Sequence, residues 1–201
     1  HHFAAISVAR WREGRPELAA VHAPLLDEYF AAETGRGATL ERPALGLGPR
    51  SLRASDCTSL DDALLATGFP YVRGALARLN LSLCAHALSR ARGLRRAGSA
   101  ALDLCYVAAG RLDGYWEMAL QPWDLAAGTL VAREARAVVS DFRGRGEVLD
   151  GRRVCAAAPG LHTDLLAMIK AAHAHPEMDV LAAPLATGLP LEGPLVGEGE
   201  R

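Results

Sequence analysis

The chain has 201 residues, of which 50% are hydrophobic and 22% are charged. This composition excludes the weakly hydrophobic, highly charged class of disordered chains, and the length suffices for one domain or for two small packed lobes. The formal net charge is -1, so the chain lacks the positive excess that binding to a nucleic-acid backbone requires. We therefore expect a globular protein that does not bind nucleic acid.

The sequence contains no sign of a membrane segment or of metal-binding cysteines. No apolar run is long enough to cross a bilayer, and no charged-then-apolar leader opens the chain, which favours a cytoplasmic protein without a membrane partner. The four cysteines form no C-x-x-C pair, so the sequence predicts neither a zinc site nor a redox motif. We expect them to be small buried side chains, at Cys57, Cys84, Cys105 and Cys155.

The first quarter of the chain is predicted to be antiparallel, because short apolar runs alternate there with turn residues. The expected strands are residues 3–9, 18–22, 29–33 and 38–40. A turn is expected at residues 13–15. Residues 42–59 are rich in Pro, Gly, Ser and Arg, which is typical of a connection between two lobes. We place the boundary between these lobes after residue 55.

Beyond that boundary, strand-like and helix-like stretches alternate, which predicts an α/β lobe with crossover helices over residues 56–174. The expected strands are residues 64–67, 94–96, 113–118, 138–141 and 153–157. Apolar side chains recur at helical spacing in four further segments. These segments are residues 72–92, 99–110, 122–135 and 161–172. Gly110 is expected to cap a helix, and residues 175–201 are expected to form a Pro- and Gly-rich tail.

Two carboxylates are predicted at one edge of this lobe. A strand delivers Glu117, and the next helix begins at Pro122 with Asp124 in its first turn. Helix N-termini favour anionic groups, and sites commonly form at such edges of α/β sheets. A carboxylate there can hold a hard cation such as Mg²⁺. The alternative is that Asp124 only complements the helix dipole and that Glu117 is a solvated strand residue.

Several motifs resemble one known family. Residues 123–128 read W-D-L-A-A-G, residues 113–117 read D-G-Y-W-E, and residues 96–101 read R-A-G-S-A-A. They resemble the W-D-x-A-A-G signature, the D-[AG]-Y-x-E strand and the R-x-x-G-[ST]-A-A segment of the inositol monophosphatase family, whose members are Mg²⁺-dependent phosphatases. Residues 3–9 and 24–38 are similar to the central hairpin of that family. The resemblance implies a layered α-β-α sandwich, in which the first strands are the remnant of an N-terminal lobe, residues 1–55.

The resemblance also implies roles for single residues. Asp124 corresponds to a metal ligand for Mg²⁺, and Glu117 corresponds to a carboxylate that accepts hydrogen bonds from substrate hydroxyls. Gly98, Ser99 and Ala100 correspond to a substrate-binding turn at a helix start, where glycine permits close approach of the backbone. The alternative for Gly98 and Ser99 is an ordinary turn with a serine cap.

The sequence departs from the family pattern in two places. It lacks the D-P-[IL]-D-G-T-x-N motif and an upstream glutamate, and we expect that motif to end just before His1. Because two-metal hydrolysis needs several carboxylates, we expect the chain as given to be inactive alone. Arg136 and Ala137 stand where the family usually has Gly-Gly at a left-handed helix cap, a difference that costs about 1 kcal/mol.

We therefore predict part of a Mg²⁺-dependent phosphomonoesterase that forms a homodimer and hydrolyses inositol phosphate or a similar small polyol or sugar phosphate. Glu117 favours inositol phosphate over histidinol phosphate or a nucleotide phosphate. The alternative is a shortened, non-catalytic paralogue that acts through dimerisation or regulation. Loss of the front layer of the fold would expose apolar surface, so such a chain should associate with itself or with a partner.

Overall fold

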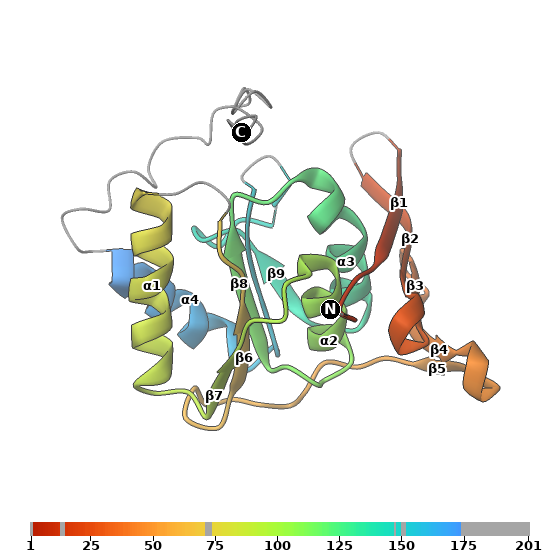
Figure 1. Cartoon of the computed structure of the whole chain (residues 1–201), viewed down its shortest axis with the longest axis horizontal. Coiled ribbons are helices and arrows are strands. Elements are labelled where there is room, and N and C mark those ends of the chain that lie inside the picture. Colours follow the sequence, from red (N-terminus) through yellow and green to blue (C-terminus); the bar gives the residue numbers. More distant parts are fainter. Residues whose placement is uncertain (1, 13–14, 71–73, 147, 150–151, 174–201) are drawn as a thin grey trace, which may run out of the picture.

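The fold has four layers in the order sheet, helices, sheet, helices (Figure 1). The structure is a computed structural model that describes residues 2–12, 15–70, 74–146, 148–149 and 152–173. Most of the predicted turn at residues 13–15 lies outside the described residues, as does the predicted tail at residues 175–201. The layers confirm the predicted α/β class.

The first sheet is antiparallel, with its strands in the order β1 to β5. These strands are β1 (Ile6–Arg12), β2 (Arg15–Ala23), β3 (Glu28–Glu33), β4 (Gly37–Arg42) and β5 (Leu47–Ser51). Successive side chains point to opposite faces of a strand. Val21, Phe30 and Leu40 are therefore buried on the inner face, while Ile6 and Val8 are each 60% exposed on the outer face.

The strand β5 corrects the prediction that residues 42–59 are only a loose connection. After the short 3-10 turn Pro43–Leu45, Gly46 adopts a left-handed conformation with φ 64°. This turn sends the chain back along β4, so that Leu47–Ser51 pairs with it. Every residue of β5 is exposed, so the strand has no apolar alternation by which the sequence would reveal it.

The second sheet is mixed, with the strand order β7-β6-β8-β10-β9. Its strands are β6 (Leu64–Thr67), β7 (Gly93–Arg95), β8 (Gly114–Met118), β9 (Val138–Ser140) and β10 (Arg153–Ala157). The parallel pairs β6–β7 and β6–β8 confirm the expected crossover helices. β10 is antiparallel to both of its neighbours, because a loop rather than a helix connects it to β9.

Four helices fill the two helical layers in the described part of the chain (Figure 1). α2 (Ala100–Ala108) and α3 (Pro122–Glu134) lie between the sheets, whereas α1 (Ala75–Leu88) and α4 (His162–His173) cover the far face of the second sheet. α2 is apolar and buried on nearly all sides, as expected for a helix between two sheets. The predicted cap is confirmed, since Gly110 follows α2 with φ 66°.

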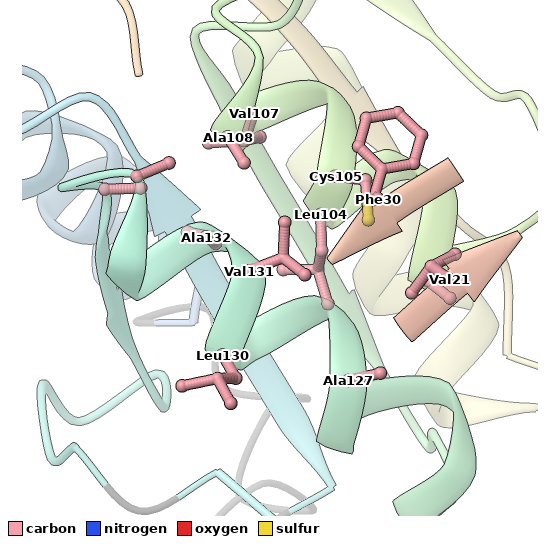
Figure 2. Packing of buried hydrophobic residues seen from close by; sticks show 14 of the residues in the cluster. Val21, Phe30, Leu104, Cys105, Val107, Ala108, Ala127, Leu130, Val131 and Ala132 are labelled. Carbon is pink, nitrogen blue, oxygen red and sulfur yellow. The ribbon is translucent and has the colours of Figure 1, made fainter. Parts of the chain in front are cut away.

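Close packing of α2 against α3 depends on Gly128. A Cβ atom at this position would lie 2.8 Å from the Cβ of Leu104 and 3.1 Å from the carbonyl oxygen of Ala101. The close neighbour of Gly128 is therefore another helix, not a sheet. Figure 2 shows the surrounding core, in which Val21 and Phe30 of the first sheet face α2 and α3.

Two further predictions concern the burial of the cysteines and the absence of a membrane segment. Cys84, Cys105 and Cys155 are buried as free thiols, as predicted, whereas Cys57 is half-buried. Among the described helices, none combines the length and the apolar character that spanning a membrane would demand.

Candidate functional site

A pocket of about 260 Å³ opens where β6, β7 and β8 end and where α2 and α3 begin. Parallel strands present their carboxyl ends at one edge of a sheet, and helix N-termini present unpaired amide groups, so ligands commonly bind at such an edge. The residues that the sequence predicts for the site all line this pocket. They are Gly98, Ser99, Ala100, Glu117 and Asp124.

Glu117 lies in the wall of the pocket and is only 9% exposed. The Tyr115 hydroxyl donates a hydrogen bond to Glu117 Oε2 at 2.5 Å, because the two residues are neighbours on one face of β8. Burial raises the pKa of Glu117 to about 7, although the Tyr115 hydrogen bond and the charge of Arg96 lower it. The alternative that Glu117 is a solvated strand residue is therefore wrong.

Gly68 makes room for the Glu117 carboxyl group. A Cβ atom on Gly68 would lie 2.1 Å from that group, so a larger residue would displace it. The Gly68 carbonyl accepts a hydrogen bond from the side chain of the fully buried Asn80 at 2.7 Å, and Asn80 also accepts one from Trp116 Nε1 at 3.1 Å. The end of β6 is thus fixed behind the pocket. In the sequence Gly68 only follows the strand expected at residues 64–67, and nothing there points to its contact with Glu117.

The turn before α2 has the shape that its glycine permits. Gly98 has φ 100°, and a Cβ atom there would lie 2.6 Å from Nη1 of Arg96. The Arg96 guanidinium in turn lies 5.9 Å from the centre of the Phe69 ring, which also lines the pocket. Ser99 occupies the N-cap position of α2 but makes no side-chain capping hydrogen bond. The alternative of an ordinary serine cap is therefore wrong.

Asp124 combines a helix-terminal role with a place in the pocket. Its Oδ2 accepts a hydrogen bond from the backbone N–H of Gln121 at 2.9 Å, so it stabilises the start of α3, as the alternative for this residue expects. Ser7 Oγ donates to the neighbouring Trp123 carbonyl at 3.0 Å and holds β1 against the same helix start. The Trp123 side chain is 63% exposed at the rim.

The residues around Asp124 do not make a complete metal site. Across the described ranges, no three acidic, histidine or cysteine side chains gather in an arrangement that would hold a metal ion. Mg²⁺ takes oxygen ligands in near-octahedral geometry, and two-metal hydrolysis needs several carboxylates. Asp124 by itself therefore does not fit a catalytic Mg²⁺ site.

Asp103 is a second acidic residue near the pocket, and the sequence does not single it out. It lies one turn into α2 and is 1% exposed, and neither of its carboxyl oxygens has a hydrogen-bond partner in the described structure. Burial and the charge of Glu117 raise the pKa of Asp103 to about 8, against the opposite effect of Arg96. Its one signal in the sequence is an acid within an otherwise apolar helix.

Known proteins match this chain over most of its length. A model described as the inositol monophosphatase family matches residues 1–175. A Nus factor SuhB of Escherichia coli strain K12 is 41% identical over 169 residues, or 84% of this chain and 60% of that protein. The solved SuhB of Mycobacterium tuberculosis is 40% identical with a TM-score of 0.73, over 84% of this chain and 64% of that one.

A solved inositol monophosphatase from Anabaena is 32% identical with a TM-score of 0.76, and the match covers 83% of this chain and 65% of that one. The chain thus spans about 60% of the length of curated relatives that it matches.

Proposed function

The chain belongs to the inositol monophosphatase family, and we propose that it forms the C-terminal, substrate-binding part of a Mg²⁺-dependent phosphomonoesterase for inositol phosphate or a similar small polyol or sugar phosphate. The pocket carries this proposal, because a buried carboxylate, a left-handed glycine turn and a helix-terminal aspartate line it together. Residues 1–55 would belong to the N-terminal lobe of the complete protein, and residues 56–174 would form its C-terminal lobe. Since curated relatives are longer, the activity is proposed for the longer protein.

In this proposal Glu117 accepts hydrogen bonds from substrate hydroxyls. A buried acceptor suits this task, because a hydrogen bond is stronger where water is excluded. Tyr115 and Gly68 support it, one by a hydrogen bond and the other by leaving room. The turn formed by Gly98 and Ser99 would bring the backbone at the start of α2 close to the substrate.

Asp124 is the proposed contribution of this chain to a Mg²⁺ site. The described residues lack the further carboxylates that such a site needs, so we assign no catalytic step to this chain alone. The remaining ligands are expected from other residues of the longer protein.

The test compares two proteins, the 201-residue chain and a longer form that includes the coding sequence upstream of His1. Phosphate release from inositol monophosphate is measured with and without Mg²⁺. We expect Mg²⁺-dependent turnover from the longer form and none from the shorter one. A longer form that hydrolyses no polyol or sugar phosphate would overturn the proposal.

A matched pair of variants in the longer form tests the role of Glu117. Glu117→Gln should raise KM for inositol monophosphate about 10-fold or more, since a hydrogen bond to a charged group is lost. Its effect on phenyl phosphate, which has no hydroxyl groups, should be small. Glu33→Gln on the exposed end of β3 is the control and should leave both substrates unaffected.

A second candidate is a non-catalytic role through self-association. The outer face of the first sheet has no helix or strand over it among the described residues (Figure 1), and it exposes Ile6, Val8 and Leu18. A largely apolar groove of about 510 Å³ crosses this face. Apolar surface of this kind marks interaction sites. Several relatives are named Nus factors rather than phosphatases, which also favours a role other than catalysis.

Light scattering on the 201-residue chain tests this second candidate. We expect an oligomer for the parent chain, and dissociation when Ile6 and Val8 are both replaced by Ser. Leu88→Ser is the control, because Leu88 is equally exposed but lies on α1, away from this sheet. A monomeric parent chain would exclude the candidate.

A further inference from the structure

Asp103 and Glu117 form a pair of buried acids beside the pocket, and their surroundings differ. The charge of Arg96 acts on both acids, but Glu117 also accepts a hydrogen bond from the Tyr115 hydroxyl. Asp103 is even more deeply buried, and no described residue donates a hydrogen bond to it. The structure therefore stabilises the ionised form of Glu117 better than that of Asp103.

Burial, hydrogen-bond donors and nearby charges determine which acid of the pair retains a proton. A buried carboxylate without a donor loses its hydration and receives nothing in exchange, so its ionised form is strongly disfavoured. Among the described residues, the groups that face the pair from the surrounding elements include a single cation. They are Arg96 before α2, Cys105 on α2, Tyr115 on β8 and Asp124 on α3. One cation does not balance two buried carboxyl groups and the nearby Asp124, so one acid of the pair stays neutral.

We propose that Asp103 is a positioning residue for Glu117: it carries the proton of the buried pair, so that Glu117 meets the substrate as the ionised partner. The inference rests on the proposed function, since it concerns how Glu117 accepts substrate hydroxyls. A neutral Asp103 places no negative charge beside Glu117, which keeps its position against Tyr115 and Gly68. The pKa of Asp103, about 8, lies above that of Glu117, about 7, in agreement with this order of ionisation.

Infrared difference spectroscopy on the 201-residue chain tests where the proton lies, without any need for catalysis. At neutral pH, the parent chain should show the carbonyl stretch of a buried protonated carboxyl group. Asp103→Asn should remove the larger part of this band, because the pKa of Asp103, about 8, lies above that of Glu117, about 7, and Asp103 is therefore the more protonated of the two at neutral pH. Glu117→Gln should retain it, because burial, the largest cause of the raised pKa of Asp103, is unchanged.

The matched control for this measurement is Asp141→Asn. Asp141 is as buried as Asp103, but it accepts hydrogen bonds from the backbone N–H groups of Arg143 and Arg145 and from the Arg145 side chain. Its replacement should therefore leave the band in place. A band that keeps its full intensity in Asp103→Asn, or one that disappears in Glu117→Gln alone, would put the proton on another group and overturn the proposal.

Kinetics of the longer form test whether this proton matters for the substrate. Asp103→Asn mimics the neutral acid, so KM for inositol monophosphate should change less than about 2-fold at neutral pH, against about 10-fold or more for Glu117→Gln. Above the pKa of Asp103, about 8, KM of the parent should rise while that of Asp103→Asn should not. In both proteins kcat should follow the same pH profile.

Two outcomes would contradict the positioning role. Parallel pH profiles of KM in the parent and in Asp103→Asn would show that Asp103 has only a structural role. A 10-fold rise in KM of Asp103→Asn at neutral pH would show that its ionised form is needed. A longer form without phosphatase activity would instead overturn the proposed function, and the infrared result would still decide where the proton lies.

Discussion

Two buried acidic side chains near α2, Glu28 and Asp103, differ in whether they are paired. Glu28, on β3, is 5% exposed and is paired with Arg111 Nη1 at 2.6 Å and with the Tyr106 hydroxyl at 3.0 Å. Asp103 is 1% exposed and has no hydrogen-bond partner in the described structure. An unpaired buried polar group lowers stability. The unpaired acid interacts with Glu117 of the pocket, whereas the paired acid does not line the pocket, which agrees with the positioning role proposed for Asp103.

The largest loss of stability is expected from removing the buried ion pair between Arg111 and Glu28. Arg111→Met removes the cation that pairs with the buried Glu28, and it also removes the contact of the guanidinium with the Tyr106 ring. We expect the free energy of unfolding to fall by about 3 kcal/mol, because an uncompensated charge stays buried. Urea denaturation measures this change.

The control for that prediction is an exposed ion pair. Arg53 pairs with Asp56 at 3.1 Å, but both side chains are mostly exposed. Arg53→Met should therefore change stability by less than about 0.5 kcal/mol. Equal effects of the two substitutions would show that burial of Glu28 does not determine the energetics of its pair.

The second largest loss of stability is expected from disturbing the packing of α2 against Gly128 of α3. Gly128→Ala should destabilise the protein by about 2 kcal/mol, because the new Cβ would overlap Leu104 and crowd the Ala101 backbone. The control is Gly48→Ala on β5, where nothing lies within 4 Å of a Cβ atom. Thermal unfolding of both variants measures the difference. A stable Gly128→Ala would mean that α2 and α3 separate without cost.

Replacement of the unpaired acid, Asp103, is expected to stabilise the protein instead of destabilising it, and by an amount that depends on pH. The pKa of Asp103 rises from an ordinary value of 3.8 to about 8 on folding, through burial and then the charge of Glu117. The folded state therefore binds this proton more tightly than the unfolded state does. The contribution of this proton to the free energy of unfolding is fully present below about pH 4 and is lost as the pH rises through about 8. Asn cannot ionise, so Asp103→Asn avoids this loss of stability and should stabilise the protein by about 1–2 kcal/mol at pH 8.

Urea denaturation across this pH range checks the prediction. The gain in stability of Asp103→Asn over the parent should vanish near pH 4 and should grow as the pH rises. Asp56→Asn, at an exposed position, is the control and should show no such trend. A gain that does not depend on pH would mean that the substitution acts through packing and not through the ionised carboxyl group.

The comparison of the two acids also shows what the sequence predicts and what it does not. The buried strands and the helices have apolar periodicity, so their positions follow from the sequence. The exposed strand Leu47–Ser51 has none and depends on the turn at Gly46. Glu117 and Asp124 stand at the edge between a strand and a helix, which makes them candidates from the sequence alone. Their roles stay predictions.

Other features of the pocket depend on neighbours that are distant in the sequence. Gly68 follows the strand expected at residues 64–67, and only the fold brings it against Glu117. Asp103 is read as an acid in an apolar helix, and only the fold reveals that nothing described pairs with it. Such tertiary contacts leave no periodic pattern in the sequence, so local reasoning misses them.

The smallest predicted effect compares the ends of α2 and α3. Each helix has an alanine at its C-cap, Ala109 or Ala135, followed by a left-handed residue, which is Gly110 with φ 66° in one and Arg136 with φ 70° in the other. Arg136 thus adopts a left-handed conformation where the family usually has glycine. Glycine has no steric penalty in this conformation, whereas an L side chain costs about 1 kcal/mol.

Arg136→Gly should therefore stabilise the protein by about 1 kcal/mol, as measured by urea denaturation. The reciprocal change, Gly110→Arg, should cost more than this, because its Cβ would also lie 3.3 Å from the Arg53 carbonyl oxygen. If Arg136→Gly gained nothing while Gly110→Arg was costly, contacts of the exposed Arg136 side chain would have to offset the backbone strain. The two helix ends would then differ in their side-chain contacts and not only in the residue at the cap.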